Sequence, residues 1–206
     1  MNVWRTRLNG WLTPIAAASP ISPNAISCLA LGLMLAGAVT LSFARRDPVM
    51  FLIALPIVIV GGLLDAMDGV VARVQGRVSR LGDFLDHFFD RIADLSLLAG
   101  WILGASIRLD LGLVALILVS LHGYLGTQIE ASFGERDYDQ TGRGEFVLVL
   151  VIFPLLAWNL AQAGILHMTY GGLTIPEWAT TLLAAGAAAG LLQRFRWGIN
   201  RAKELR

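Results

Sequence analysis

The chain has 206 residues, of which 56% are hydrophobic and only 15% are charged. Soluble domains of this size usually carry about 25% charged residues, so the composition argues against a soluble protein and predicts a polytopic membrane protein. The net charge of +1 gives no indication of nucleic-acid binding.

The first 18 residues have the pattern of a helix lying in a membrane interface. Apolar residues such as Trp4, Leu8 and Trp11 recur at helical spacing, with Arg5 and Arg7 elsewhere on the helical wheel. The following stretch, Ser19-Pro20-Ile21-Ser22-Pro23-Asn24, interrupts that helix. It starts the first predicted span, with Pro23 near the first helical position.

Long uncharged runs then predict an all-α membrane protein with six spans. Residues 24–44, 111–129 and 146–176 contain no charged residue at all, and a span needs roughly 20 mostly apolar residues. The spans are expected at about 24–44, 49–70, 82–107, 111–133, 145–163 and 177–197. Neither a repeat nor a linker interrupts them, which indicates one domain covering residues 1–206.

Basic residues predict how the spans are oriented. Six spans place both termini on one side, and the opposite loops hold only Arg45, Arg46 and Arg108. The termini and their loops carry Arg5, Arg7, Arg73, Arg77, Arg80, Arg136, Arg143, Arg194, Arg196, Arg201, Lys203 and Arg206. Because the more basic side is usually cytoplasmic, both termini are expected in the cytoplasm.

Two further residue types suggest how the helices are placed. The pairs Gly100 with Gly104 and Gly186 with Gly190 would let helix backbones approach closely, either within the bundle or in a dimer. Tryptophans near predicted span ends, Trp101 among them, suit anchoring at the membrane interface.

Four aspartates cluster at the junction of the second and third spans. Asp65 and Asp68 are i, i+3 neighbours, and Asp86 and Asp90 are i, i+4 neighbours, so each pair lies on one helix face. The intervening turn is short. The two helices are therefore expected to pack antiparallel, with their acidic faces meeting near the cytoplasmic side.

Such a cluster needs compensation, because close carboxylates repel by several kcal/mol in a low dielectric. Either some are protonated or they bind cations, and oxygen ligands favour Mg²⁺, Mn²⁺ or Ca²⁺. Two metal ions between helices suit phosphoryl chemistry. The alternative is pairing with Arg73, Arg77 or Arg91, and an intrahelical pair of Arg91 with Asp94 is expected in either case.

The cluster resembles the motif of the CDP-alcohol phosphotransferase family, D-x-x-D-G-x-x-A-R followed after about eight residues by G-x-x-x-D-x-x-x-D. Every fixed position is present: Asp65, Asp68, Gly69, Ala72, Arg73, Gly82, Asp86 and Asp90. The Ser22–Ser27 stretch is similar to the family's T/S-P-N-x-I/L-T opening of the first span. Family members have six membrane helices after an amphipathic helix, which agrees with the layout above.

The resemblance implies a reaction in which an alcohol displaces CMP from a CDP-activated lipid, either CDP-diacylglycerol or CDP-archaeol. It implies that the four aspartates bind two divalent cations, Mg²⁺ or Mn²⁺, and that Asp90 is the general base. The expected CDP-binding residues are Asp68, Gly69, Ala72, Arg73, Ser79, Gly82 and Asn24. The active site would face the cytoplasm, and a homodimer is expected.

The acceptor alcohol stays open. Relatives that use inositol phosphate hold its phosphate through basic residues in the fourth span and a G-x-x-R-x-E-R-like stretch, which Arg143 and Glu145 resemble. Arg136, Arg143 and Gln128 are the candidate acceptor-binding residues. Phe146, Gly126 and Gln128 stand where relatives carry basic residues, which counts against a phosphorylated inositol. A polyol or a polyol phosphate, such as glycerol phosphate or inositol phosphate, is expected.

Two other classes of protein are compatible with membrane-embedded aspartates. A membrane prenyltransferase also holds Mg²⁺ against a diphosphate, but its aspartates fall in two distant motifs. A cation transporter would place carboxylates at the membrane midplane, whereas these gather near one face.

Overall fold

The structure, a computed structural model, describes residues 13, 14, 16, 18–134 and 143–205, and only the backbone of residues 143–150. Most of the predicted interfacial helix at 1–18 therefore lies outside the described residues. The long helices follow the predicted segments within about four residues, except that the last helix ends seven residues later than predicted: α2 (Pro23–Ser42), α3 (Val49–Val74), α4 (Arg80–Gly104), α5 (Leu109–Phe133), α6 (Arg143–Gln162) and α7 (Ile175–Glu204). A 3-10 turn, η1 (Phe43–Arg45), extends α2.

The described chain is helical apart from one small hairpin, which the all-α prediction did not include. Strands β1 (Thr169–Tyr170) and β2 (Leu173–Thr174) pair antiparallel before α7. The adjoining helix starts at a capping box, in which Thr174 and Glu177 satisfy each other's backbone N–H groups.

Four of the described helices are long and apolar enough to cross a membrane: α2 together with η1, α3, α5 and α7. This is fewer than the six predicted spans. Charged residues run through the first half of α4, and of α6 only Val151–Gln162 lies in the part of the chain whose side chains the structure describes.

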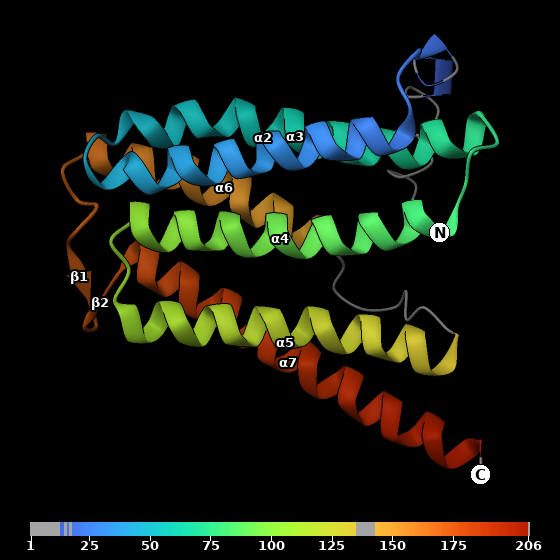
Figure 1. Cartoon of the computed structure of the whole chain (residues 1–206). Helices are drawn as coiled ribbons and strands as arrows, with labels where there is room; N and C mark the ends of the chain where they lie inside the picture. Colours follow the sequence, from blue (N-terminus) through green and yellow to red (C-terminus); the bar gives the residue numbers. More distant parts are fainter. Residues whose placement is uncertain (1–12, 15, 17, 135–142, 206) are drawn as a thin grey trace.

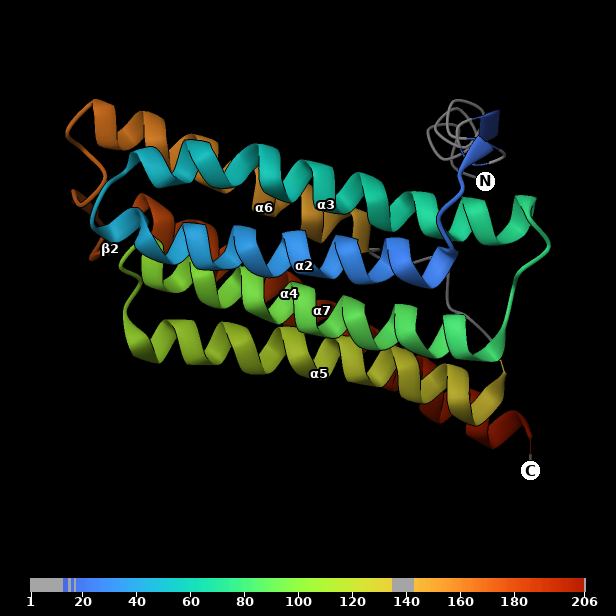
Figure 2. The same cartoon turned by 45° about the horizontal axis from the view of Figure 1, so that its top comes forward.

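Helix α2 packs against both α3 and α4, whereas α3 and α4 touch each other little (Figure 2). The expectation that these two helices pack against each other is therefore wrong, although carboxylates of both helices do come together, as expected. Gly100 and Gly104 explain the close approach of α4 to α2, since a Cβ at either would clash with the carbonyl oxygens of Ala38 and Leu41. These two glycines serve packing within the bundle, while Gly186 faces open space.

Trp101 lies in the core and not at the interface as expected. It is 1% exposed, and its ring packs between Phe51 and Phe153 at centroid distances of 6.0 and 5.4 Å. Its Nε1 donates a hydrogen bond to Thr180 Oγ1 at 3.0 Å, so the indole ties α4 to α7.

Asp65 and Asp68 lie in the second half of α3, and Asp86 and Asp90 lie in the first half of α4, so both pairs are toward the end of the molecule drawn on the right in Figure 1. There α2 begins, α3 ends, α4 begins, and α5 and α7 end. The β1–β2 hairpin marks the opposite end.

Candidate functional site

The turn between α3 and α4 is defined by its sequence. Gly76 adopts a left-handed φ of 63°, and the Arg77 N–H bonds back to the Ala72 carbonyl at 2.8 Å, which closes the end of α3. Ser79 then caps α4 by accepting the Gly82 N–H at 3.1 Å. The chain thus reverses direction, and the carboxylates of α3 and α4 come to the same level of the bundle.

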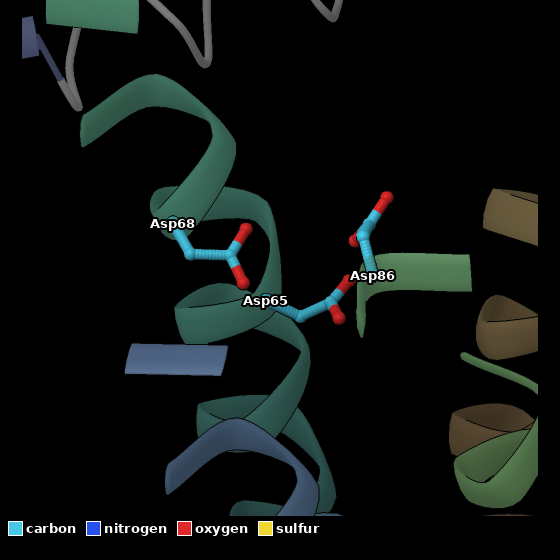
Figure 3. Close-up of side chains that lie close together, drawn as sticks. All are labelled: Asp65, Asp68 and Asp86. Atoms are coloured by element: carbon cyan, nitrogen blue, oxygen red, sulfur yellow. The ribbon is translucent and has the colours of Figure 1, made fainter. Parts of the chain in front are cut away.

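Three of the four predicted aspartates come together there (Figure 3). One carboxylate oxygen from each of Asp65, Asp68 and Asp86 lies within 4.8 Å of the other two. Asp68 is only 6% exposed, while Asp65 and Asp86 are half-buried. Asp90, one turn beyond Asp86 on α4, is 9% exposed and is not one of this trio.

Helix α2 contributes a residue that the sequence analysis missed. The Ser27 hydroxyl donates to Asp68 Oδ2 at 2.5 Å. A signal was present, because Ser27 is three residues after Asn24 in the stretch that opens the helix, and that spacing puts both on one face. Ser27 orients the most buried carboxylate of the cluster.

The candidate CDP-binding residues form two groups beside the carboxylates. The Arg73 guanidinium folds over Gly69, with Nη1 3.3 Å from the point where a Cβ would stand. At the start of α4, the position that a Cβ of Gly82 would occupy lies 3.3 Å from Ser79 Oγ and 3.6 Å from Asn24 Oδ1. Three predicted residues from two helices and a turn therefore meet at one place. Ala72 lies one turn beyond Asp68 on α3 and is half-buried.

The structure does not place the candidate acceptor-binding residues at the carboxylates. Arg136 and the side chain of Arg143 lie outside the described residues. Gln128 is on the exposed face of α5, where it accepts from Tyr124 Oη at 3.3 Å and donates to Ser132 Oγ at 3.1 Å. Both partners belong to its own helix, so the structure does not bring Gln128 to the carboxylates.

Two arginines from other helices reach α5 instead, and no local sequence pattern predicted these contacts with α5. Arg194 of α7 donates to the His122 carbonyl at 2.8 Å, and its Nη1 lies 2.6 Å from where a Cβ of Gly126 would stand. Arg91 of α4 packs directly over Gly123, which lies one helical turn before Gly126 on α5. The Arg91 guanidinium also forms the predicted ion pair with Asp94, at 3.2 Å. Arg91 and Arg194 therefore bring two guanidinium groups from α4 and α7 to one stretch of α5.

The donor set is suited to a hard divalent cation. It consists of carboxylate oxygens from two helices, one of them well buried and already oriented by Ser27. Like charges this close raise the energy of the site unless a cation or a proton compensates. Gly69 and Gly82 leave room beside the carboxylates that any larger residue would fill.

Comparison with known proteins identifies the class to which this fold and site belong. The sequence profile described as CDP-alcohol phosphatidyltransferase matches residues 20–189, so the chain belongs to that family. This confirms the resemblance found in the motif and leaves the prenyltransferase and the cation transporter without support.

Two curated relatives are similar to this chain in sequence. The chain is 36% identical over 110 residues to the archaetidylinositol phosphate synthase of Pyrococcus horikoshii, and 33% identical over 138 residues to that of Aeropyrum pernix. These matches cover 53% and 64% of this chain, and 57% and 67% of the relatives. The chain thus spans between about half and two thirds of these two proteins.

A solved structure shows the same fold. The phosphatidylinositol phosphate synthase of Mycobacterium tuberculosis, in a crystal structure with CDP-DAG bound, superposes with a TM-score of 0.67 at 24% identity. The superposition covers 90% of this chain and 92% of that one. Another structure of that enzyme, in complex with manganese and citrate, gives a TM-score of 0.69.

Proposed function

We propose that the protein transfers the phospholipid group of a CDP-activated lipid to a hydroxyl of a polyol phosphate and releases CMP. The observation that carries this proposal is the meeting of Asp65, Asp68 and Asp86 in a chain that belongs to the CDP-alcohol phosphatidyltransferase family. The donor is CDP-diacylglycerol or CDP-archaeol.

The proposed step is a single displacement at phosphorus. An acceptor hydroxyl oxygen bonds to the phosphorus that carries the lipid, the bond from that phosphorus to the bridging oxygen breaks, and CMP leaves with the electron pair. Asp90 accepts the hydroxyl proton, a role suited to a buried carboxylate near the reacting groups. Asp65, Asp68, Asp86 and Asp90 would hold two divalent cations, Mg²⁺ or Mn²⁺, whose charge offsets that of the diphosphate.

The nucleotide would lie between the end of α3 and the start of α4. Gly69, Ala72 and Gly82 give it room, and Arg73, Ser79 and Asn24 offer polar contacts. The guanidinium of Arg73 is exposed, and its fork of N–H donors matches phosphate oxygens. Asp68 lies on the same side of α3 and completes this set.

Inositol phosphate is the acceptor that we favour. The relatives from Pyrococcus horikoshii and Aeropyrum pernix are archaetidylinositol phosphate synthases. Gly126 stands where relatives that use inositol phosphate carry a basic residue, and this counted against a phosphorylated inositol. Arg194 of α7 brings a guanidinium to that position, which supplies the missing positive charge. Arg194, together with the predicted Arg136 and Arg143, would bind the acceptor phosphate.

The membrane arrangement that we propose is six spans, with both termini and the active site on the cytoplasmic side. Support comes from the described basic residues toward the site end, namely Arg73, Arg77, Arg80, Arg194, Arg196, Arg201 and Lys203. The opposite loops carry Arg45, Arg46 and Arg108. An interfacial helix before the first span, a single domain and a homodimer complete the proposal.

Product analysis tests the reaction. Purified protein with Mn²⁺ would receive CDP-diacylglycerol or CDP-archaeol and one acceptor from a panel of inositol phosphate, glycerol phosphate, inositol, glycerol and serine. We expect CMP release and a product with the mass of a lipid inositol phosphate. A product formed only with another acceptor would overturn the choice of inositol phosphate, and no product with any acceptor would overturn the reaction.

Removal of the metal tests whether the reaction requires divalent cations. EDTA should abolish CMP release, and Mg²⁺ or Mn²⁺ added in excess should restore it, because three or four carboxylates must be compensated before the diphosphate can approach. Full activity in the presence of chelator would contradict the role given to the aspartates.

A further inference from the structure

One side chain beside the site, Gln75, makes contacts that the proposed reaction does not use. It stands immediately after α3, and its side-chain amide reaches back across the chain to the segment that precedes α2. Its Nε2 donates to the Ser19 carbonyl at 3.0 Å and to the Ala16 carbonyl at 3.3 Å. Two backbone acceptors at one amide group define which end of the amide carries the nitrogen.

This contact closes a small apolar cluster at the same place. Ala16 is completely buried, and it packs with Ile26 of α2 and with Val70 and Val71 of α3. The Oε1 atom of Gln75 is covered by the protein. Gln75, which is half-buried, therefore lies at the junction between the segment before α2 and the end of α3.

The geometry of α3 links this junction to the carboxylates. Asp68 and Gln75 are seven residues apart, which is about two helical turns, so both lie along one side of α3. Asp68 bonds Ser27 of α2, and Gln75 bonds Ala16 and Ser19 before it. One side of α3 thus holds a continuous segment of chain at two points. In Figure 1 this segment enters α2 at the end where α3 stops and α4 starts.

The segment between these points is stiff and ends at the candidate nucleotide site. Pro20 and Pro23 each restrict the backbone between Ser19 and Asn24. The Ser22 side chain caps α2 by accepting the Ala25 N–H at 3.4 Å. Asn24 follows, with its Oδ1 beside Gly82 of α4. A shift at Ser19 would therefore be transmitted to Asn24.

We propose that Gln75 is a positioning residue: by holding the carbonyls of Ala16 and Ser19, it keeps Asn24 and Ser27 in place beside Gly82 and Asp68. The inference rests on the proposed function, in that Asn24 is taken to contact the CDP group. Gln75 itself acts only through the segment before α2. Its loss should weaken use of the CDP-lipid without changing the chemical step.

The test compares two substitutions that differ in hydrogen-bond donation. Gln75→Glu keeps the size of the side chain but replaces the donor with an acceptor that repels both carbonyls. Gln75→Lys keeps a donor on a flexible stem. Gln162→Ala, at an exposed glutamine at the far end of α6, is the control for purification and handling. Each full-length protein would be assayed for CMP release over a range of CDP-diacylglycerol concentrations.

We expect Gln75→Glu to raise KM for CDP-diacylglycerol on the order of tenfold at nearly constant kcat, since two hydrogen bonds are lost. Gln75→Lys should stay within about twofold of the original protein, as one ammonium can donate to both carbonyls. Hydrogen exchange supplies a readout that is independent of activity. Peptides covering Ile21–Ser27 should exchange faster in Gln75→Glu than in Gln75→Lys, while peptides of α5 and α7 should not change.

Equal KM and equal exchange in the two variants would overturn the inference and leave the proposed function standing. Faster exchange throughout α5 and α7 would also overturn it, because Gln75 would then support the whole fold and not one segment. If the unaltered protein released no CMP, the proposed function would fail. The exchange comparison would still decide whether Gln75 holds the segment.

Discussion

The carboxylate of Asp68 is subject to opposing electrostatic effects. It is 6% exposed, accepts a hydrogen bond from Ser27, and has an oxygen within 4.8 Å of oxygens from Asp65 and Asp86. A hydrogen bond from a neutral hydroxyl stabilises a carboxylate modestly, whereas two nearby carboxylates destabilise it. A divalent cation bound there would resolve this conflict, and the hydroxyl would then mainly orient the carboxylate.

The Ser27→Ala variant tests that orienting role. We expect the Mn²⁺ concentration for half-maximal activity to rise roughly tenfold, because Asp68, a carboxylate that we propose binds metal, loses the group that holds it in place. The control is Ser42→Ala on the same helix, since the Ser42 hydroxyl donates to the Val39 carbonyl at the opposite end of α2. An unchanged metal requirement in Ser27→Ala would show that Asp68 needs no such support.

Asp90 is the proposed general base, and its substitution tests that role directly. Asp90→Asn should lower kcat by at least about 100-fold, since an amide cannot accept the hydroxyl proton. Binding of the CDP-lipid should change little, because the two side chains have nearly the same shape. Asp83→Asn, on the same helix but with its side chain 60% exposed, should remain active. Activity near the original level in Asp90→Asn would remove Asp90 as the base.

At the scale of elements, α2 decides the arrangement of the site. It packs against α3 and α4 together, and it supplies both Ser27 to the carboxylates and Asn24 to the start of α4. Its contact with α4 depends on two glycines, which let the backbones meet without side chains between them. The separation of α3 from α4, and so the distance between their carboxylates, follows from this packing.

Gly100→Ala or Gly104→Ala should disturb that packing. A methyl group at either position clashes with a backbone carbonyl of α2, and overpacking typically costs about 1–3 kcal/mol. We expect a lower Tm in detergent and a loss of activity. Gly186→Ala is the matched control, because no atom lies within 4 Å of a Cβ there, and alanine favours a helix over glycine. Equal Tm values for the three variants would contradict the close α2–α4 contact.

For the whole molecule, the site and most of the described basic residues lie at one end of the bundle, and the β1–β2 hairpin lies at the other with Arg45, Arg46 and Arg108. A CDP-lipid has its acyl or isoprenoid chains in the bilayer and its nucleotide in water. A site where helices begin and end near the membrane surface can receive both parts. The same arrangement makes the sidedness of the protein measurable.

Single cysteines on a Cys28→Ser background would report that sidedness. A cysteine at Arg46 should react with a membrane-impermeant maleimide in intact cells, because its loop is predicted outside. A cysteine at Arg77 should react only after the membrane is opened. The reverse pattern would place the candidate site outside the cell and contradict the cytoplasmic assignment.

Local patterns in the sequence were sufficient for much of this description. The uncharged runs located α2, α3, α5 and α6 to within about four residues, because a membrane helix is encoded by composition over one continuous stretch. The spacing of the aspartates identified the family, since helical periodicity alone puts Asp65 with Asp68 and Asp86 with Asp90. The pair of Arg91 with Asp94 was predictable for the same reason.

Contacts between distant parts of the chain required the tertiary structure. Ser27 and Asp68 are 41 positions apart, and Arg194 and His122 are 72 apart, so no periodicity connects them. The place of α2 between α3 and α4, the burial of Trp101 and the exposure of Gln128 likewise depend on which helix faces which. A residue's spacing along one helix determines its face, but only packing of the whole bundle determines what that face meets.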